Sequence, residues 1–282
     1  SGKQDVGISY QTGSMGWHTE YVAVLNESDT RADIKAWVSI NNNSGATYEN
    51  AKLKLVAGEV NRAVNVREYL NTPLISGDRV YPVANQFQEK EFFAYHIYNL
   101  QRKTTLRNNE TKQISLFEAE DVKIKKKFKH IGNSENVSVY VEFKNSKKNN
   151  LGMPMPAGKV RFNKSDGDNL EFIGEDMITH TPKDEKIELK LGDAFDIKAE
   201  YKIMGQKNLS NKVSIKKVEI KFKNHSKKDV VIEAERYFYG DWEISKNNFD
   251  FEKKDYQTAI FKVKVDKDEE VVLKYTVRIV TP

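Results

Sequence analysis

Four lysines recur at every second position near the middle of the chain. They are Lys123, Lys125, Lys127 and Lys129, and His130 follows directly. Residues two apart in a strand point to the same face and lie ~6–7 Å apart. A row of ammonium groups at that spacing can bind a polyanion, such as an acidic polysaccharide or a phospholipid surface. Lysines on an exposed strand also protect a sheet from edge-to-edge aggregation, and we favour this second interpretation because nearby acidic residues weaken the positive field.

A second group of side chains suited to binding is aromatic and occupies residues 237–242. The rings of Tyr237, Tyr239 and Trp242 can stack on sugar faces while Asp241 accepts hydrogen bonds from sugar hydroxyls. The alternative is that alternate rings fill a core, because neighbouring residues of a strand point to opposite faces. We favour the core, and these four named residues form the candidate ligand site.

Histidines and acids form no recognisable catalytic or metal-binding motif. His180 lies near Glu175, Asp176, Asp184 and Glu185 in the sequence, a mixture that can bind zinc, or calcium through the oxygens alone. The spacing matches no metal-site motif, so we expect polar turn chemistry at a domain junction. There is no cysteine and no nucleophile elbow. We predict no catalytic residue, no metal and no cofactor; an enzyme with a site assembled from distant residues is the third-ranked hypothesis.

The elements that carry these groups are predicted to be strands. With 38% hydrophobic and 31% charged residues, the chain suits antiparallel sheets that have one wet face. Apolar and polar residues alternate over most of its length. The predicted strands are residues 21–25, 34–40, 53–57, 136–144, 187–191, 195–203, 213–222, 230–234, 257–265 and 270–279. Residues 165–168 suit a hairpin turn, and residues 60–70 have the one composition compatible with a helix.

The predicted fold class is therefore all-β, with an antiparallel β-sandwich architecture and two domains. The break is expected near Thr181 and Pro182. Residues 1–181 are then an elaborated β-sandwich or β-sheet domain. Residues 182–282 hold about seven strand signals, the number expected of an immunoglobulin-like β-sandwich.

Charge and hydropathy restrict the classes of partner. The formal net charge is +5, but 46 basic and 41 acidic residues are interspersed, so we predict no nucleic-acid partner. No apolar run approaches the ~20 residues of a transmembrane helix. No signal peptide is recognisable. The chain begins with Ser1 and Gly2 in place of methionine, and we expect a processed or truncated piece.

Several ordered segments resemble one bacterial family. They are residues 37–61, residues 152–161 with their two prolines, residues 172–185 and residues 192–196. Together they resemble a domain-of-unknown-function family that also forms the C-terminal part of mucoidy-inhibitor-A-like proteins. His18 and Thr19 depart from the family pattern, which has a small or basic pair there. The resemblance implies export to the periplasm or the exterior and supplies no catalytic residue.

The sequence thus predicts a non-enzymatic β-sandwich protein of the bacterial cell envelope or exterior. It is expected to act through protein–protein interaction with an envelope partner that the sequence does not identify. The alternative is a carbohydrate- or polyanion-binding module, with polysaccharide as its partner, that uses the aromatic group or the lysine row.

Overall fold

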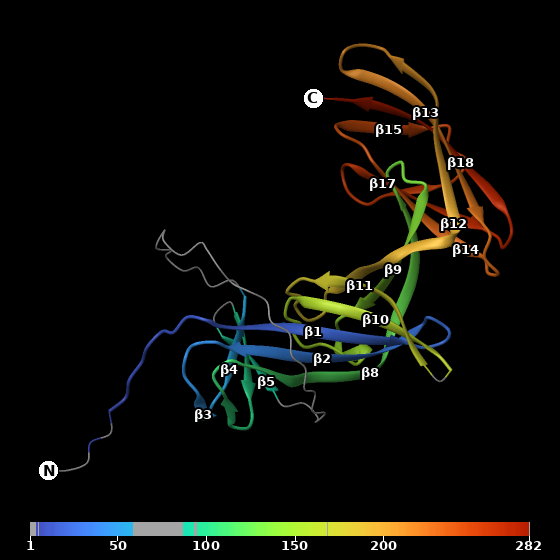
Figure 1. Ribbon diagram of the computed structural model, residues 1–282. Helices are drawn as coiled ribbons and strands as arrows, with labels where there is room; N and C mark the ends of the chain where they lie inside the picture. The colour runs from blue at the N-terminus through green and yellow to red at the C-terminus, as the bar shows by residue number, and fades with distance from the viewer. Residues whose placement is uncertain (1–3, 5, 59–86, 93–94, 168, 282) are drawn as a thin grey trace. The chain divides into compact units, whose positions relative to one another are not determined.

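The computed structural model describes residues 4, 6–58, 87–92, 95–167 and 169–281 (Figure 1). Within them the chain forms strands β1 to β18 and one short 3-10 helix, η1 (Lys147–Asn149). The predicted all-β class is confirmed, and each predicted strand overlaps an observed one. Residues 60–70, the stretch compatible with a helix, lie outside the described residues.

Two units make up the chain, and each is assembled from two chain segments. Unit 1 contains residues 1–123 and 144–187, and unit 2 contains residues 124–143 and 188–282. Strands β8 (Glu110–Ile131), β9 (Asn136–Lys144) and β12 (Lys186–Asn208) carry the chain from one unit to the other. The sequence pattern suggested a single break near residue 181, and that division stays a prediction.

The main sheet of unit 1 follows the order β11-β10-β1-β2-β8. Strand β1 (Met15–Leu25) is antiparallel to β2 (Arg31–Asn42) and parallel to β10 (Gly158–Asp166). Strand β10 continues into β11 (Asn169–Ile178) through the predicted hairpin turn, in which Gly167 has a φ of +69°. Figure 1 shows β1, β2 and β8 side by side. The sheet is therefore mixed, whereas the sequence pattern predicted antiparallel pairing.

Two smaller sheets complete unit 1. One has the order β4 (Lys54–Ala57), β6 (Tyr95–Leu100) and β5 (Phe87–Phe92); the other pairs β3 (Tyr48–Ala51) with β7 (Thr104–Leu106). Tyr21 of β1 and Tyr98 of β6 are buried and donate hydrogen bonds to the carbonyl oxygens of Pro156 and Pro154, each at 2.7 Å. A proline has no backbone N–H to donate in a sheet, but its carbonyl oxygen can accept a hydrogen bond. The bonds to the two tyrosines therefore fix the loop that contains Pro154 and Pro156.

Unit 2 is built around strands from both of its segments. The second half of β8 pairs antiparallel with β9 and parallel with β14 (Val230–Tyr237). Strand β14 pairs with β17 (Thr258–Val265), which pairs with β16 (Phe251–Lys253). The remaining order is β12-β13-β18-β15, with β13 at Val213–Asn224, β18 at Glu270–Val280 and β15 at Asp241–Ser245.

The core of unit 2 joins β14 and β17 to β13 and β18. Phe261 of β17 stacks on Tyr275 of β18 with ring centroids 5.2 Å apart, and both are buried. On β12, Ile197 and Ala199 reach this core as the alternation predicted. Phe195 was expected on the same inward face, but it is 89% exposed. Ala194 packs against the core instead, so the alternation of inward-facing residues shifts between Ala194 and Ile197.

Candidate functional sites

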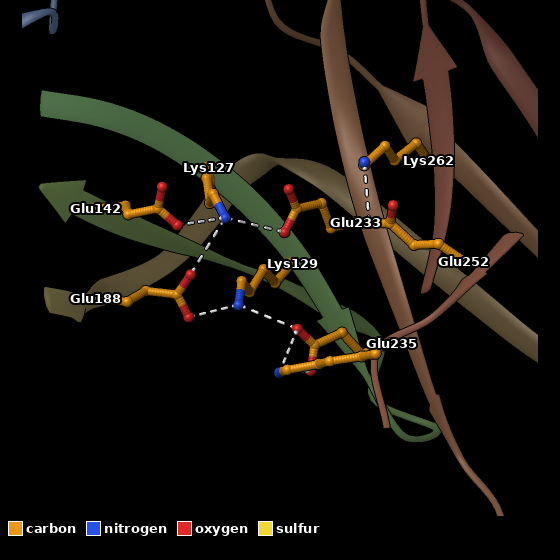
Figure 2. A network of polar contacts seen from close by, with 9 residues as sticks. Lys127, Lys129, Glu142, Glu188, Glu233, Glu235, Glu252 and Lys262 are labelled. Carbon is orange, nitrogen blue, oxygen red and sulfur yellow. Dashed lines mark hydrogen bonds and ion pairs between the residues drawn. The ribbon is translucent and has the colours of Figure 1, made fainter. Parts of the chain in front are cut away.

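Lys127 and Lys129 of the lysine row lie in a network of glutamates inside unit 2 (Figure 2). The ammonium nitrogen of Lys127 is 2.7 Å from a carboxylate oxygen of Glu142, and it also contacts Glu188 and Glu233 at 3.4 and 3.5 Å. Lys129 makes a second set of contacts. Its nitrogen is 2.5 Å from Glu188 and 3.1 Å from Glu235, the carboxylate of which also receives Lys254 at 3.4 Å.

The network follows from strand pairing. Strand β8 carries the two lysines and lies between β9 and β14, both of which present glutamates. Opposite charges on neighbouring strands attract one another in a sheet. Only 12% of the Lys127 side chain and 6% of the Lys129 side chain are exposed. Burial opposes their charge, but hydrogen bonds and the fields of the glutamates outweigh it and raise the pKa of both lysines.

The four lysines therefore do not form one free row. Lys123 and Lys125 are exposed, while the ammonium groups of Lys127 and Lys129 are occupied by carboxylates. A polyanion that bound Lys127 or Lys129 would have to displace those carboxylates from a poorly hydrated environment, which is costly. The geometry favours a structural role for these two lysines, and polyanion binding stays a hypothesis for Lys123 and Lys125.

The aromatic group is divided between core and surface. Trp242 is 8% exposed, packs against Phe238 and Phe251, and donates its indole N–H to the carbonyl oxygen of Tyr256 at 2.8 Å. Lys253 lies 4.4 Å from the centre of its ring. Trp242, which the sequence placed in the candidate ligand site, thus belongs to the core of unit 2, whereas Tyr237, Tyr239 and Asp241 are exposed.

His130, the residue after the lysine row, is fully buried beside the buried guanidinium group of Arg236. Arg236 donates one hydrogen bond to Nδ1 of His130 and another to the carbonyl oxygen of Gly132. The other ring nitrogen, Nε2, is 2.7 Å from the carbonyl oxygen of Ser134, so it carries the proton. Burial and the charge of Arg236 lower the pKa of His130 to about 4. The site therefore holds a neutral imidazole in one tautomer.

This arrangement predicts a loss of stability on mild acidification. Because the pKa of His130 is about 4 in the folded chain and ~6.5 when unfolded, the unfolded chain binds the proton first as the pH falls between those values. From this histidine, we expect the free energy of unfolding to be about 2 kcal/mol lower at pH 5 than at pH 7. Urea denaturation at the two pH values measures it.

A matched pair of histidine variants isolates this contribution. His130→Asn should reduce the difference between pH 5 and pH 7, whereas the exposed His225→Asn should leave it unchanged. The assignment is wrong if both variants keep the full pH dependence of the parent chain.

His180 does not meet its neighbouring acids in a metal site. It is exposed, and its Nδ1 accepts a hydrogen bond from the backbone N–H of Ala157 at 3.1 Å. Glu175 instead binds Lys159 and Arg161; the hydrogen bond from Lys159, and then the positive charges of both residues, lower the pKa of its carboxyl group. In the described part of the chain, no three His, Asp or Glu side chains are grouped to hold a metal ion. Nor do these residues include a helix with the length and apolar character needed to cross a membrane.

Strand β11 is a surface that the sequence analysis did not single out. Among the described strands it pairs only with β10, and no other described strand lies beside its second edge. Leu170, Phe172 and Met177 are 59%, 59% and 60% exposed. The register places all three on the face of the sheet that carries Lys159 and Arg161 of β10. The strand contains three acids and no basic residue or proline. The feature of the sequence that could have indicated this surface is the mixture of apolar and acidic residues that follows the hairpin turn.

The comparisons with known proteins add no relative. The chain matches no protein-family model, and no curated protein is similar to it at a significant level. The resemblance to the bacterial family described above therefore stays a prediction.

Proposed function

We propose that the chain is a non-enzymatic interaction module that binds an extended segment of a partner protein along strand β11. The observation that carries the proposal is an edge strand with three large apolar side chains exposed on one face, Leu170 and Phe172 as neighbours and Met177 beyond Glu175. The edge of such a strand presents backbone N–H and C=O groups that a further strand can pair with. Free sheet edges are often protected by lysine or proline, which β11 lacks, or by other charges and bulges; β11 carries three acids and a register shift opposite Phe162 and Asn163.

The charge of β11 indicates the chemistry of the partner. Glu171, Glu175 and Asp176 give the strand three acidic side chains. A second copy of the chain paired on β11 would bring like charges together, which destabilises cross-strand pairs. A segment that alternates apolar with basic residues would instead pack on Leu170 and Phe172 and attract Glu171, since Glu175 is already paired with Lys159 and Arg161. The partner we propose is an extended, basic and apolar segment of another protein.

Short fluorescent peptides test this proposal directly. A peptide that alternates valine or isoleucine with lysine or arginine should bind with a Kd on the order of 1–100 μM, measured by fluorescence polarisation. Phe172→Lys, which places a charge beside Leu170 on the exposed face, should weaken binding at least about tenfold. Phe195→Lys alters another exposed phenylalanine and should not change it.

Two control peptides separate strand addition from charge attraction. The same peptide with glutamate in place of its basic residues should bind less tightly. N-methylation of alternate residues preserves charge and side chains but removes main-chain donors, and it should abolish binding. The proposal fails if the basic peptide does not bind, or if the N-methylated peptide binds equally well.

The finer architecture and the compartment are part of the proposal. We infer that unit 2 is a β-sandwich of immunoglobulin-like type, since β14 and β17 pack on β13 and β18 through one apolar core. A location in the bacterial cell envelope or exterior is supported by the sequence resemblance. Sandwiches with exposed edges are a recurrent scaffold for protein recognition.

A further inference from the structure

Three exposed tyrosines gather at one end of the β14–β17 pair in unit 2. Tyr237 is opposite Thr258 in that pair, and the next residue, Phe238, donates its backbone N–H to the carbonyl oxygen of Gln257 at 2.8 Å. Tyr256 lies in the turn between β16 and β17, which the bond from the backbone N–H of Lys254 to the carbonyl oxygen of Thr258 closes, so its backbone is at the same end of the pair. The exposed fractions of Tyr237, Tyr239 and Tyr256 are 65%, 63% and 80%. Tyr10, near the start of the chain, is 69% exposed as well.

Contacts with the core of unit 2 fix the backbone that carries these rings. The indole N–H of Trp242 bonds to the carbonyl oxygen of Tyr256, and Phe238 packs against the ring of Trp242 at 5.0 Å between centroids. Gly240 has a φ of +92° and lies against the backbone of Val280, where a Cβ atom would be only 2.2 Å from a carbonyl oxygen. Rings on a fixed backbone lose little conformational freedom when they bind, which favours affinity.

The surroundings of the tyrosines are polar. Asp241, Lys254 and Asp255 are exposed beside them, and the one large aliphatic side chain exposed close by on β8 is Ile131, opposite Glu235. Hydrogen bonds to backbone N–H groups, first that of Gln257, lower the pKa of Asp255, so its carboxylate is ionised at neutral pH. The centres of protein interfaces are apolar and depleted of charge, unlike this surface. Phenol rings bordered by carboxylates suit a ligand with an apolar face and hydroxyl groups at its rim.

We propose that Tyr237, Tyr239 and Tyr256, here called the tyrosine platform, bind a neutral carbohydrate by stacking on its sugar rings. The C–H faces of the sugars lie against the aromatic rings. Asp241, Asp255 and the phenol groups exchange hydrogen bonds with the sugar hydroxyls. The site belongs to unit 2 and uses none of the residues proposed for protein binding on β11.

Affinity gel electrophoresis of the full chain tests the platform. The gels contain a neutral soluble polysaccharide (hydroxyethylcellulose, laminarin, xylan or galactomannan) or the acidic polysaccharide alginate. We expect at least one neutral polysaccharide to retard the chain, to the same extent at low and high salt. Tyr239→Ala and Tyr256→Ala should each weaken that binding about tenfold, and the double variant should abolish it. Phe195→Ala, which removes another exposed ring of unit 2, should bind like the parent chain.

The remaining outcomes overturn the proposal. They are unchanged migration on every neutral gel, retardation by alginate alone that disappears with salt, and equal weakening by Phe195→Ala. Because both tyrosines are exposed, the variants should keep the melting temperature of the parent chain. If the tyrosine variants lose the basic peptide while sugar binding is unaltered, the surface binds protein instead. The two proposals can fail independently. Phe172→Lys should weaken peptide binding on β11 but should not alter migration on a neutral gel, so a negative peptide test does not affect the result for sugar binding.

Discussion

Replacing Trp242 with alanine is expected to lower the free energy of unfolding of unit 2 by about 3–5 kcal/mol. The ring lies in the core between Phe238 and Phe251, so its removal leaves a large cavity. The carbonyl oxygen of Tyr256 also loses its hydrogen bond. Urea denaturation followed by far-ultraviolet circular dichroism measures the change.

Two companion variants make the Trp242 result specific. Trp242→Phe keeps most of the ring volume and should cost clearly less than alanine. Tyr239→Ala removes a neighbouring exposed ring and should alter stability by no more than about 0.5 kcal/mol. If Trp242→Ala is as stable as the parent chain, the placement of this ring in the core is wrong.

Replacing Lys129 with methionine is the second substitution with a large expected effect. Methionine keeps the apolar stem but removes the ammonium group that lies between Glu188 and Glu235. These carboxylates would then be left partly buried without that cation. Removing one partner of a buried ion pair is strongly destabilising, and we expect unit 2 to lose about 3 kcal/mol.

Tryptophan fluorescence can report this loss for unit 2 alone. The chain has three tryptophans, and in a background with Trp17→Phe and Trp37→Phe the remaining one is Trp242. The matched control is Lys125→Met, which removes an exposed lysine of the same row and should stay within about 0.5 kcal/mol. Equal stability of the Lys125 and Lys129 variants would contradict the structural role of the network.

The strands could be predicted from the sequence because half-buried strands impose a period of two on apolar residues. Strand β9 has the bounds that the alternation indicated. The passage of β8 from one unit to the other could not be predicted. Apolar and polar residues alternate through Lys123 and Ile124 without a glycine, a proline or a polar loop, and a boundary within a continuous strand leaves no compositional mark. The parallel pairing of β1 with β10 depends on contacts distant in sequence, which local patterns do not encode.

The candidate sites were predictable to a different degree. The lysine row was visible in the sequence. The partners of Lys127 and Lys129 could not be predicted, because Glu188, Glu233 and Glu235 come from distant strands. Alternation indicated that neighbouring rings of residues 237–242 face opposite ways, but it could not say which face is core. Tyr256 joins the group through the turn between β16 and β17, where its carbonyl oxygen accepts the indole N–H of Trp242. The edge position of β11 likewise depends on the order of strands in the sheet.

Amide hydrogen exchange of β11, read residue by residue by nuclear magnetic resonance, tests the central claim most directly. In the presence of saturating basic peptide, strand addition predicts that alternate amides between Asn169 and Ile178 exchange at least about tenfold more slowly. The amides of β16, which pairs only with β17 among the described strands, should be unaffected. Peptide binding without protection in β11, or with protection confined to another strand, would contradict the claim that this edge is the binding site.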